Sequence, residues 1–448
     1  MSLDHFGKVK ELLERESVRF VDLRACDLLG RWRHVTIPAA QFTEEAVERG
    51  VGFDGSNYGF AGVEQSDMVL IPDLGTARID PLAGEPMLSL ICDLYEADAG
   101  REPLRFDPRG TAKRAGSYLR GTGLADELRV APEFEFYLFK ESRVACSGRR
   151  IELCLEPCTE GGEDGTSAYH AMPPRDGLLE LRNEISAHLE AQRLSVKYHH
   201  HEVGSAGQAE IELNFMGLVE AADAIMLVKD AVRRVALRHG LKATFMPKPL
   251  HGEAGSGLHL HQRLVRDGAN CFADPEGHAG LSKLALGYIA GLLRHGASLM
   301  AFTNPSTNSY RRFVPGFEAP IEPRFAVADR SGAVRIPGYV RNQAERRIEL
   351  RTMDATANPY LALAAILLAG LDGVREGLDP LREDFSAAPL PRSLEEALEA
   401  LEADQAYLHL GGVFSEEQIA HWIRSKRAEA ASVQQRPHPY EFLLYFDL

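Results

Sequence analysis

The sequence predicts a two-domain protein that combines helices and strands, and three observations support this. The chain has 448 residues, which exceeds one ordinary core because domains average about 150 residues. Residues 1–103 contain mainly strand patterns, whereas residues 104–448 alternate strands with long helices. Glycine and proline are frequent between Glu96 and Gly110, which is typical of a linker. We therefore expect domains at residues 1–103 and 104–448.

In the first domain, a short amphipathic helix is predicted at residues 7–15. Strands are predicted at residues 18–24, 31–37, 68–72 and 88–95, where apolar and β-branched residues alternate or cluster.

In the second domain, the apolar stripe of residues 218–239 predicts a long helix that ends at Gly240. Asn358-Pro359 predicts an N-cap followed by proline at the first helical position, which opens a buried helix rich in alanine and leucine. Further helices are expected at residues 111–119 and after capping boxes that begin at Ser393 and Ser415.

Charge and apolar content restrict the possible partners. The formal net charge is −15, and an acidic surface favours neither nucleic acid nor an anionic membrane as the main partner. The first residues lack the apolar segment and cleavage site of a signal peptide. The longest apolar run, near residues 360–371, is shorter than the ~20 residues needed to cross a bilayer. We expect a cytoplasmic protein without nucleic-acid or membrane partners.

The cysteines agree with a reducing compartment. The six cysteines are sparse and have no Cys-x-x-Cys spacing. Cys154 and Cys158 resemble half of a metal site, but no second half is visible in the sequence.

A glycine-rich loop between Phe245 and His261 combines features of a binding site. It contains three glycines, which permit close approach of the backbone to a ligand. If residues 258–262 form a strand, the two-residue period places His259 and His261 on one face. Such a pair is metal-binding in some proteins and structural in others, so other residues must decide between these interpretations.

Alternating carboxylates mark two further strands. In residues 131–139, Glu133 and Glu135 share one face while aromatic residues occupy the other. Carboxylates about 6–7 Å apart on a strand can hold a hard cation, although a solvent-facing acidic edge has the same pattern. Residues 200–213 add Glu202, Glu210 and Glu212 around a glycine-rich turn.

Arginines are concentrated between residues 311 and 351 of this acidic chain. Within residues 347–351, Arg347, Glu349 and Arg351 alternate on one predicted face, which favours a lined cleft over a wet surface. Arginine recognises carboxylates and phosphates through its forked guanidinium group. Oxygen ligands for a metal together with clustered arginines are typical of phosphoryl transfer. The sequence has neither a P-loop nor a Rossmann glycine motif.

Several independent segments along the chain form a characteristic series. They are Phe53-Asp-Gly-Ser, Pro132-Glu-Phe-Glu-Phe, His201-Glu-Val, Phe245-Met-Pro-Lys-Pro, Gly255-Ser-Gly-Leu-His, Asn304-Pro-Ser-Thr-Asn-Ser-Tyr, Val314-Pro-Gly-Phe-Glu-Ala-Pro and Ala357-Asn-Pro-Tyr-Leu. In these segments and their order, the sequence resembles the glutamine synthetase family, in its bacterial type I branch, from about residue 18 to the end of the chain.

The resemblance implies an α+β fold with an N-terminal β-grasp domain and a catalytic domain. The catalytic domain is expected to contain a curved antiparallel sheet that forms an open funnel among surrounding helices. The resemblance further implies a homo-oligomer, a dodecamer of two hexameric rings, in which each active site is completed by the neighbouring subunit's N-terminal domain.

The resemblance also implies a two-step reaction with ATP as co-substrate and Mg²⁺ or Mn²⁺ as cofactors, two or more per site. ATP phosphorylates the γ-carboxylate of glutamate, and an amine then attacks the acyl phosphate. The implied metal ligands are Glu135, Glu202 and Glu210 for one ion and Glu133, His259 and Glu349 for the other. The implied glutamate-binding residues are Gly255, Arg312 and Arg351, and the implied phosphate- or nucleotide-binding residues are Arg330, Arg335, Arg347 and His261. The implied amine pocket consists of Tyr169, Glu202, Glu318 and Asp54 of the adjacent subunit.

Several positions depart from the family pattern near the glutamate and amine pockets. Ala254 replaces the usual asparagine, which removes a hydrogen bond worth about 0.5–1.5 kcal/mol. Asn57 replaces a serine, Arg263 replaces a serine near the nucleotide, and Asp329 replaces an asparagine. We see no counterpart of the tyrosine-bearing adenylylation loop in residues 377–386.

From these changes we expect a ligase that joins glutamate to an organic amine, such as a polyamine or monoamine. One alternative is glutamine synthetase proper, which uses ammonium. The other is a non-catalytic structural or regulatory paralogue, although every implied metal ligand and phosphate arginine is present.

Overall fold

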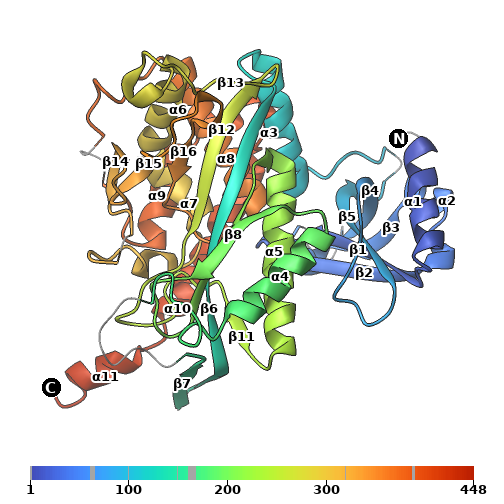
Figure 1. Cartoon of the computed structure of the whole chain (residues 1–448), viewed down its shortest axis with the longest axis horizontal. Helices are drawn as coiled ribbons and strands as arrows, with labels where there is room; N and C mark the ends of the chain where they lie inside the picture. The colour runs from blue at the N-terminus through green and yellow to red at the C-terminus, as the bar shows by residue number, and fades with distance from the viewer. Residues whose placement is uncertain are drawn as a thin grey trace.

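The computed structural model describes residues 3–60, 66–98, 100–148, 150–159, 168–317, 319–385 and 389–448. Within these ranges the chain forms one sheet of five strands and one sheet of eleven strands. The smaller sheet lies at one end of the molecule with helices α1 and α2, and the other helices lie around or beside the larger sheet (Figure 1). This arrangement confirms the predicted α+β class.

The smaller sheet has the strand order β2-β1-β5-β4-β3. Strands β1 and β5 are parallel, and the other neighbouring strands are antiparallel. All four strands predicted in this part of the chain are present, with shifted or extended ends. The elements are α1 (Leu3–Arg15), β1 (Phe20–Cys26), β2 (Trp32–Pro38), α2 (Glu44–Arg49), β3 (Val51–Asp54), β4 (Asp67–Ile79) and β5 (Met87–Glu96).

The larger sheet has the main order β14-β15-β16-β12-β6-β9-β8. Outside this order, β7, β10 and β11 pair with β6, and β13 pairs with β12. Its pairs are antiparallel except for β14 and β15, which are parallel. The strands are β6 (Glu127–Ser147), β7 (Arg150–Pro157), β8 (Val196–His201), β9 (Gln208–Leu213), β10 (Met216–Gly217), β11 (Lys242–Thr244), β12 (Leu258–Arg266), β13 (Ala269–Asn270), β14 (Glu322–Val327), β15 (Gly332–Ile336) and β16 (Ile348–Leu350).

Three of the remaining helices in the described residues, α8, α9 and α10, begin at caps that the sequence predicts. The Asn358 side chain accepts a hydrogen bond from Tyr360 N at 3.2 Å, and the Ser393 and Ser415 hydroxyls each cap a helix in the same way. The helices are α3 (Pro108–Thr122), α4 (Leu179–Ala191), α5 (Leu218–Arg238), α6 (Lys283–Arg294), α7 (Gly296–Thr303), α8 (Pro359–Arg375), α9 (Leu394–Ala403), α10 (Glu416–Gln434) and α11 (Pro439–Tyr445).

Helix α5 connects the two sheets. It passes between the larger sheet and the N-terminal strands (Figure 1). Its charged side chains take part in ion-pair networks that reach β5 and the end of β4. The Asp223 carboxylate lies 3.0 Å from the Arg109 guanidinium, which also contacts Asp93 of β5 at 2.8 Å. Farther along α5, the Arg234 guanidinium lies 2.7 Å from the carboxylate of Asp80, which follows β4. These contacts fix the smaller sheet against the helix.

In the part of the chain that the structure describes, no single helix has the length and apolar composition of a membrane span. The bent pair α6 and α7, which meet at 76°, passes that test only when taken together.

Candidate active site

The central strand β6 has two chemically different faces. Phe134 and Phe136 are fully buried in the core, and the two-residue strand period sends Glu133 and Glu135 to the opposite face. On that face, Glu133 is paired with His259 of β12, the strand that includes the predicted residues 258–262. The apolar face therefore anchors the strand, and the acidic face is held in a fixed position.

The same register extends the row of polar side chains across the sheet. Glu135 of β6 is opposite Glu210 of β9, and Glu210 is opposite His200 of β8. Directly paired residues on antiparallel strands lie on one face. On the other side of β12, His261 is opposite Glu349 of β16, which is opposite Arg335 of β15. Residues distant in sequence are thus collected on one surface of the sheet.

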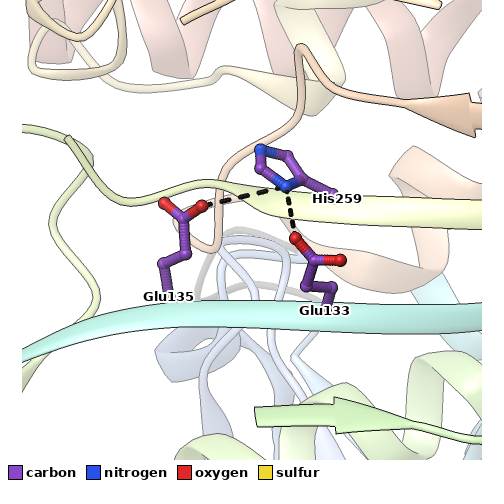
Figure 2. A group of neighbouring side chains, drawn as sticks. All are labelled: Glu133, Glu135 and His259. Carbon is purple, nitrogen blue, oxygen red and sulfur yellow. Dashed lines mark hydrogen bonds and ion pairs between the residues drawn. The ribbon is translucent and has the colours of Figure 1, made fainter. Parts of the chain in front are cut away.

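His259 lies at the centre of this surface. Its Nδ1 atom lies 2.8 Å from Glu133 Oε1 and 3.8 Å from Glu135 Oε1 (Figure 2). Its Nε2 atom lies 3.0 Å from a terminal guanidinium nitrogen of Arg312. Because Arg312 occupies Nε2, the Nδ1 atom is the ring nitrogen that faces the carboxylates.

Glu349 lies on the side of the site that carries arginines. Both of its carboxylate oxygens are paired, one with Arg335 and the other with Arg351. Burial raises its pKa, but His261 and Arg351 outweigh burial and lower the pKa of Glu349 to about 2. This carboxylate is therefore ionised at all physiological pH values.

Glu202 and Glu210 behave in the opposite way. Burial, followed by the nearby carboxylates of Glu135 and Glu210, raises the pKa of Glu202 to about 9. Burial and the carboxylates of Glu133 and Glu135 also raise the pKa of Glu210 well above its usual value. Crowded, buried carboxylates repel one another unless a cation neutralises them. Their arrangement therefore fits a divalent metal ion.

Among the described residues, three groups of side chains have ligand atoms close enough to share one ion, within 4.8 Å of one another in each group. Oxygen-rich sets with an occasional imidazole suit Mg²⁺ and Mn²⁺. The groups are Glu133, Glu135 and His259; Glu133, Glu212 and His261; and His200, Glu202 and Glu210.

Two cavities meet at these carboxylates. The larger cavity, about 960 Å³, has the size of a site for a nucleotide-sized ligand. The smaller cavity, about 150 Å³, suits an amino acid in size and is lined by Ala254, Gly255, Arg312 and Arg351. Residues that line both cavities are Glu135, Glu202, Val203, His259 and Arg351. The metal-binding groups therefore stand between a large and a small compartment.

Gly257 shows how tightly the smaller cavity is built. Its N–H donates a hydrogen bond to Glu135 Oε2 at 2.6 Å. A Cβ atom at this position would lie 2.5 Å from His259 Nε2 and 2.6 Å from a guanidinium nitrogen of Arg312. Only glycine lets the loop pass this close to the two side chains.

The predicted site residues fall into distinct locations. The structure gathers most of them around the two cavities, and Arg330 and Tyr169 line the larger one. Arg347 is buried and lines neither cavity, but its guanidinium lies 3.1 Å from the hydroxyl of Tyr339, which lines the larger cavity. Asp54 is exposed at the end of β3 and also lines neither cavity. Glu318 lies outside the described residues.

Two residues of these groups, Glu212 and His200, had no site role predicted from the sequence. Glu212 is opposite Glu133, and its carboxylate lies 2.7 Å from Lys197 Nζ. His200 Nε2 lies 3.1 Å from the Glu210 carboxylate. The alternation of Gln208, Glu210 and Glu212 on one strand was a usable signal. No comparable pattern distinguished His200 within its run of histidines.

Comparison with known proteins defines the class of this chain. Residues 105–445 match the model for the glutamine synthetase catalytic domain, and residues 17–97 match the model for the glutamine synthetase β-grasp domain. The chain therefore belongs to the glutamine synthetase family, as its motifs predict. This family uses ATP and divalent Mg²⁺ or Mn²⁺, in agreement with the clustered carboxylates.

Individual relatives cover the chain almost completely. It is 44% identical to a glutamine synthetase of Streptomyces filamentosus over 98% of this chain and 99% of the relative. It is 42% identical to a glutamine synthetase of Aquifex aeolicus, with 98% of both chains covered. The structure also resembles Plasmodium falciparum glutamine synthetase, with a TM-score of 0.89, 26% identity, and coverage of 97% and 98% of the two chains.

Proposed function

We propose that this protein is a glutamine synthetase, which uses ATP to join ammonium to the γ-carboxylate of L-glutamate through a γ-glutamyl phosphate. The main support is the junction of a large and a small cavity at a set of paired carboxylates. Its relatives from several organisms carry the name glutamine synthetase, which favours ammonium over the organic amine that the sequence departures suggested.

In this proposal, ATP occupies the larger cavity and glutamate the smaller one. Arg312 and Arg351 hold the carboxylates of glutamate, and Gly255 contributes its backbone. The metal ligands are Glu135, Glu202 and Glu210 at one ion and Glu133, His259 and Glu349 at the other. When bound, these ions neutralise the phosphate charge at the junction. Arg330, Arg335, Arg347 and His261 serve the phosphates and nucleotide.

The ammonium pocket is proposed to lie beside Tyr169 and Glu202. Burial and the Glu202 and Glu210 carboxylates raise the pKa of Tyr169, so its hydroxyl stays neutral. A carboxylate beside the incoming ammonium favours its binding and accepts its proton. Glu318 and the neighbouring subunit's Asp54 complete the proposed pocket.

We also propose that the protein assembles as a dodecamer of two hexameric rings, with a domain boundary near residue 104 between residues 1–103 and 104–448. The exposed position of Asp54, away from both cavities of its own chain, supports sites shared between neighbours.

The deciding experiment measures ADP release with ATP, Mg²⁺ and glutamate across ammonium, monoamines and polyamines. We expect the highest kcat/KM with ammonium and formation of glutamine. A higher kcat/KM with an organic amine would transfer the proposal to that amine. An absence of glutamate-dependent turnover with every amine, despite ATP and metal binding, would favour the non-catalytic alternative.

One observation keeps an organic amine as the second candidate. Aromatic rings gather beside the acidic cluster in the larger cavity. The Tyr169 and His170 rings stack at 3.9 Å, His170 lies 4.4 Å from His200, and Tyr198 lies 6.0 Å from His200. Tyrosine faces attract organic ammonium groups through cation–π interactions.

The substitution Tyr198→Ala tests this second candidate. If the rings bind an organic amine, kcat/KM for that amine falls by about fivefold, as expected for loss of about 1 kcal/mol of cation–π attraction. The kcat/KM for ammonium should change less, because ammonium is small enough to bind among the carboxylates without contacting the Tyr198 ring. Equal losses for both amines would remove the support for this candidate.

A further inference from the structure

A third cavity lies apart from the candidate active site. Its volume is about 470 Å³, and it shares no lining residue with either of the two cavities described above. Its walls come from the turn between β1 and β2, from helices α5 and α10, and from segments near residues 244–246, 305–306 and 355–356. It therefore lies where the N-terminal domain meets the catalytic domain.

The carboxylates of this cavity are already paired. Asp230 lies 3.5 Å from the Arg24 guanidinium and 3.2 Å from that of Arg234, and neither arginine lines the cavity. Glu429 lies 2.8 Å from Lys426 Nζ. The negative charges in the wall are thus neutralised by protein groups.

Three cations of the wall have no such partner. Arg31, Lys229 and Arg233 make no ion pair with a carboxylate of the described residues. Lys229 Nζ donates one hydrogen bond, to Ala355 O at 2.7 Å, although an ammonium group can donate three. The Arg233 guanidinium lies 5.4 Å from the Phe245 ring centre. Positive charge therefore exceeds negative charge around this cavity.

Two further features agree with an anionic ligand. The indole N–H of Trp32 is buried and has no acceptor in the described part of the chain, and Trp32 lines the cavity. Burial, reinforced by Arg233, lowers the pKa of Lys229 to about 8, as expected for an ammonium group that lacks a counter-ion.

We propose that this cavity binds an oxyanion, the phosphate or carboxylate group of a small metabolite, held by Arg31, Lys229 and Arg233. Guanidinium and ammonium groups form strong charge-assisted hydrogen bonds with such groups. The cavity volume exceeds that of an isolated phosphate, which leaves space for the remainder of the metabolite beside Trp32 and Phe245.

The position of the cavity couples it to the smaller cavity of the active site. Ser306 precedes Arg312 in one loop, and Ala355 follows Arg351 in another. These loops touch where the Arg312 guanidinium donates to Thr352 O at 3.0 Å. An oxyanion that draws Lys229 away from Ala355 O shifts the second loop. The resulting change in KM for glutamate rests on the proposed function, whereas anion binding itself does not.

Tryptophan fluorescence provides the binding test. The chain has two tryptophans: Trp32 lines the cavity, and the Trp422 ring lies 5.2 Å from Lys426 Nζ in its wall. Inorganic phosphate and malonate are titrated separately into the full-length protein with the active site saturated by ADP, Mg²⁺ and glutamate. We expect a saturable change with at least one anion, and the anion that gives it identifies the preferred chemistry.

Two variants make the result specific. Arg233→Gln and Lys229→Met should each weaken binding by at least about tenfold through loss of a charge-assisted hydrogen bond. Arg233 is exposed at the surface, so its variant should fold even if the Lys229 variant does not. Arg238→Gln, on the same helix and outside the cavity, should bind as the natural protein does. A lack of saturation with both anions, or equal binding by Arg233→Gln, would overturn the proposal.

Kinetics then separate the coupling from the proposed function. The anion should change KM for glutamate in the natural protein and in Arg238→Gln, but not in Arg233→Gln. Saturable binding with an unchanged KM would refute the coupling alone. Absence of turnover in every sample, with binding intact, would refute the proposed function and leave the anion site standing.

Discussion

Individual carboxylates of the candidate active site have opposite electrostatic settings, although all are glutamates. Glu133 is buried, which raises its pKa, but hydrogen bonds to His259 and His261 lower that pKa well below the usual value. Glu202 has mainly acidic neighbours, and its pKa is about 9. Glu133 is therefore ionised whether or not a metal ion is bound. Glu202 is protonated near neutral pH and loses its proton when a cation binds beside it.

Glu133→Gln tests the metal-binding role. Glutamine keeps the size of the side chain but removes the charge beside His259 Nδ1. We expect affinity for Mn²⁺, measured by calorimetry on metal-stripped protein, to fall by about 100-fold or more, given that even supporting residues of metal sites cost about 10–100-fold. Glu141→Gln, on the same strand and paired with Arg143 at the surface, is the matched control. Unchanged affinity in Glu133→Gln would remove Glu133 from the ligand set.

Gly257→Ala tests the close approach at the smaller cavity. The added methyl group would crowd His259 and Arg312 at 2.5 and 2.6 Å, and overpacking costs about 1–3 kcal/mol. We expect kcat/KM for glutamate to fall by at least about fivefold, with nucleotide binding retained. Gly121→Ala, where no heavy atom lies within 4 Å of the added carbon, should leave kinetics unchanged. Full activity of Gly257→Ala would show that the loop adjusts freely.

At the scale of elements, helix α5 determines how the two sheets meet, through buried ion pairs. Arg109→Met would remove the cation that pairs with Asp223, whereas Asp93 would keep Lys113 at 2.6 Å. Removing one partner of a buried pair costs about 3–5 kcal/mol, so we expect a loss of this size in urea denaturation.

The control for this prediction is an exposed pair. Arg427 contacts Glu402 at 2.6 Å, and both side chains are nearly half exposed. Arg427→Met should cost less than about 1 kcal/mol. Similar losses in Arg109→Met and Arg427→Met would show that the buried network does not hold the helix.

The residue that caps the N-terminus of helix α3, Asp107, has an unusually high pKa. Burial, followed by Asp93, raises the pKa of Asp107 from 3.8 to about 7, while its carboxyl group accepts hydrogen bonds from the N–H groups of Arg109 and Leu94. The pKa of Asp107 is higher in the folded protein than in the unfolded chain. Between pH 3.8 and about 7, the folded protein therefore binds one more proton than the unfolded chain. This contribution to stability is present at low pH and is lost as pH rises toward 7.

Asp107→Asn isolates that contribution. Asparagine keeps an acceptor for the Arg109 N–H but does not titrate. Thermal unfolding should show that the Tm of the natural protein minus that of Asp107→Asn decreases from pH 5 to pH 7.5. A difference that stays constant or increases over this range would contradict the sign of the effect.

The elements show what local sequence can determine. The caps at Asn358, Ser393 and Ser415 and the end of α5 before Gly240 were predicted because each depends on neighbouring residues. Strand ends were less well predicted: β6 extends from Glu127 to Ser147, far beyond the predicted 131–139. Its length depends on pairing with β12, β9 and β7, and those partners are distant in sequence.

For the whole molecule, motifs nominated candidate site residues but not their spatial relations. The pairing of Glu133 with Glu212 depends on the register of β6 and β9, which no single segment encodes. Arg31, Lys229 and Arg233, which have no ion-pair partner in the described part of the chain, also could not be recognised, because in the sequence they look like ordinary charged residues of a turn and a helix. Only the fold shows which charges have partners.

We expect each active site to be shared between two neighbouring subunits. Asp54 belongs to the smaller sheet and lines neither active-site cavity of its own chain. Glu133 belongs to the larger sheet and lines the larger cavity. If a neighbour supplies Asp54, then Asp54→Asn and Glu133→Gln disable different partners of the same site. Two separately inactive variants can then restore each other's activity when they share a ring.

Co-expression of the two variants with different affinity tags, followed by tandem purification, yields mixed rings. A site in a mixed ring is intact when a subunit with native Glu133 meets a neighbour with native Asp54. In a closed ring with head-to-tail interfaces, random mixing gives this arrangement at about a quarter of the sites. We expect that fraction of natural ADP release, against near-zero release from each variant alone. If each chain held a complete site, every site in the mixed rings would carry one of the two substitutions, and activity would stay at the level of the separate variants.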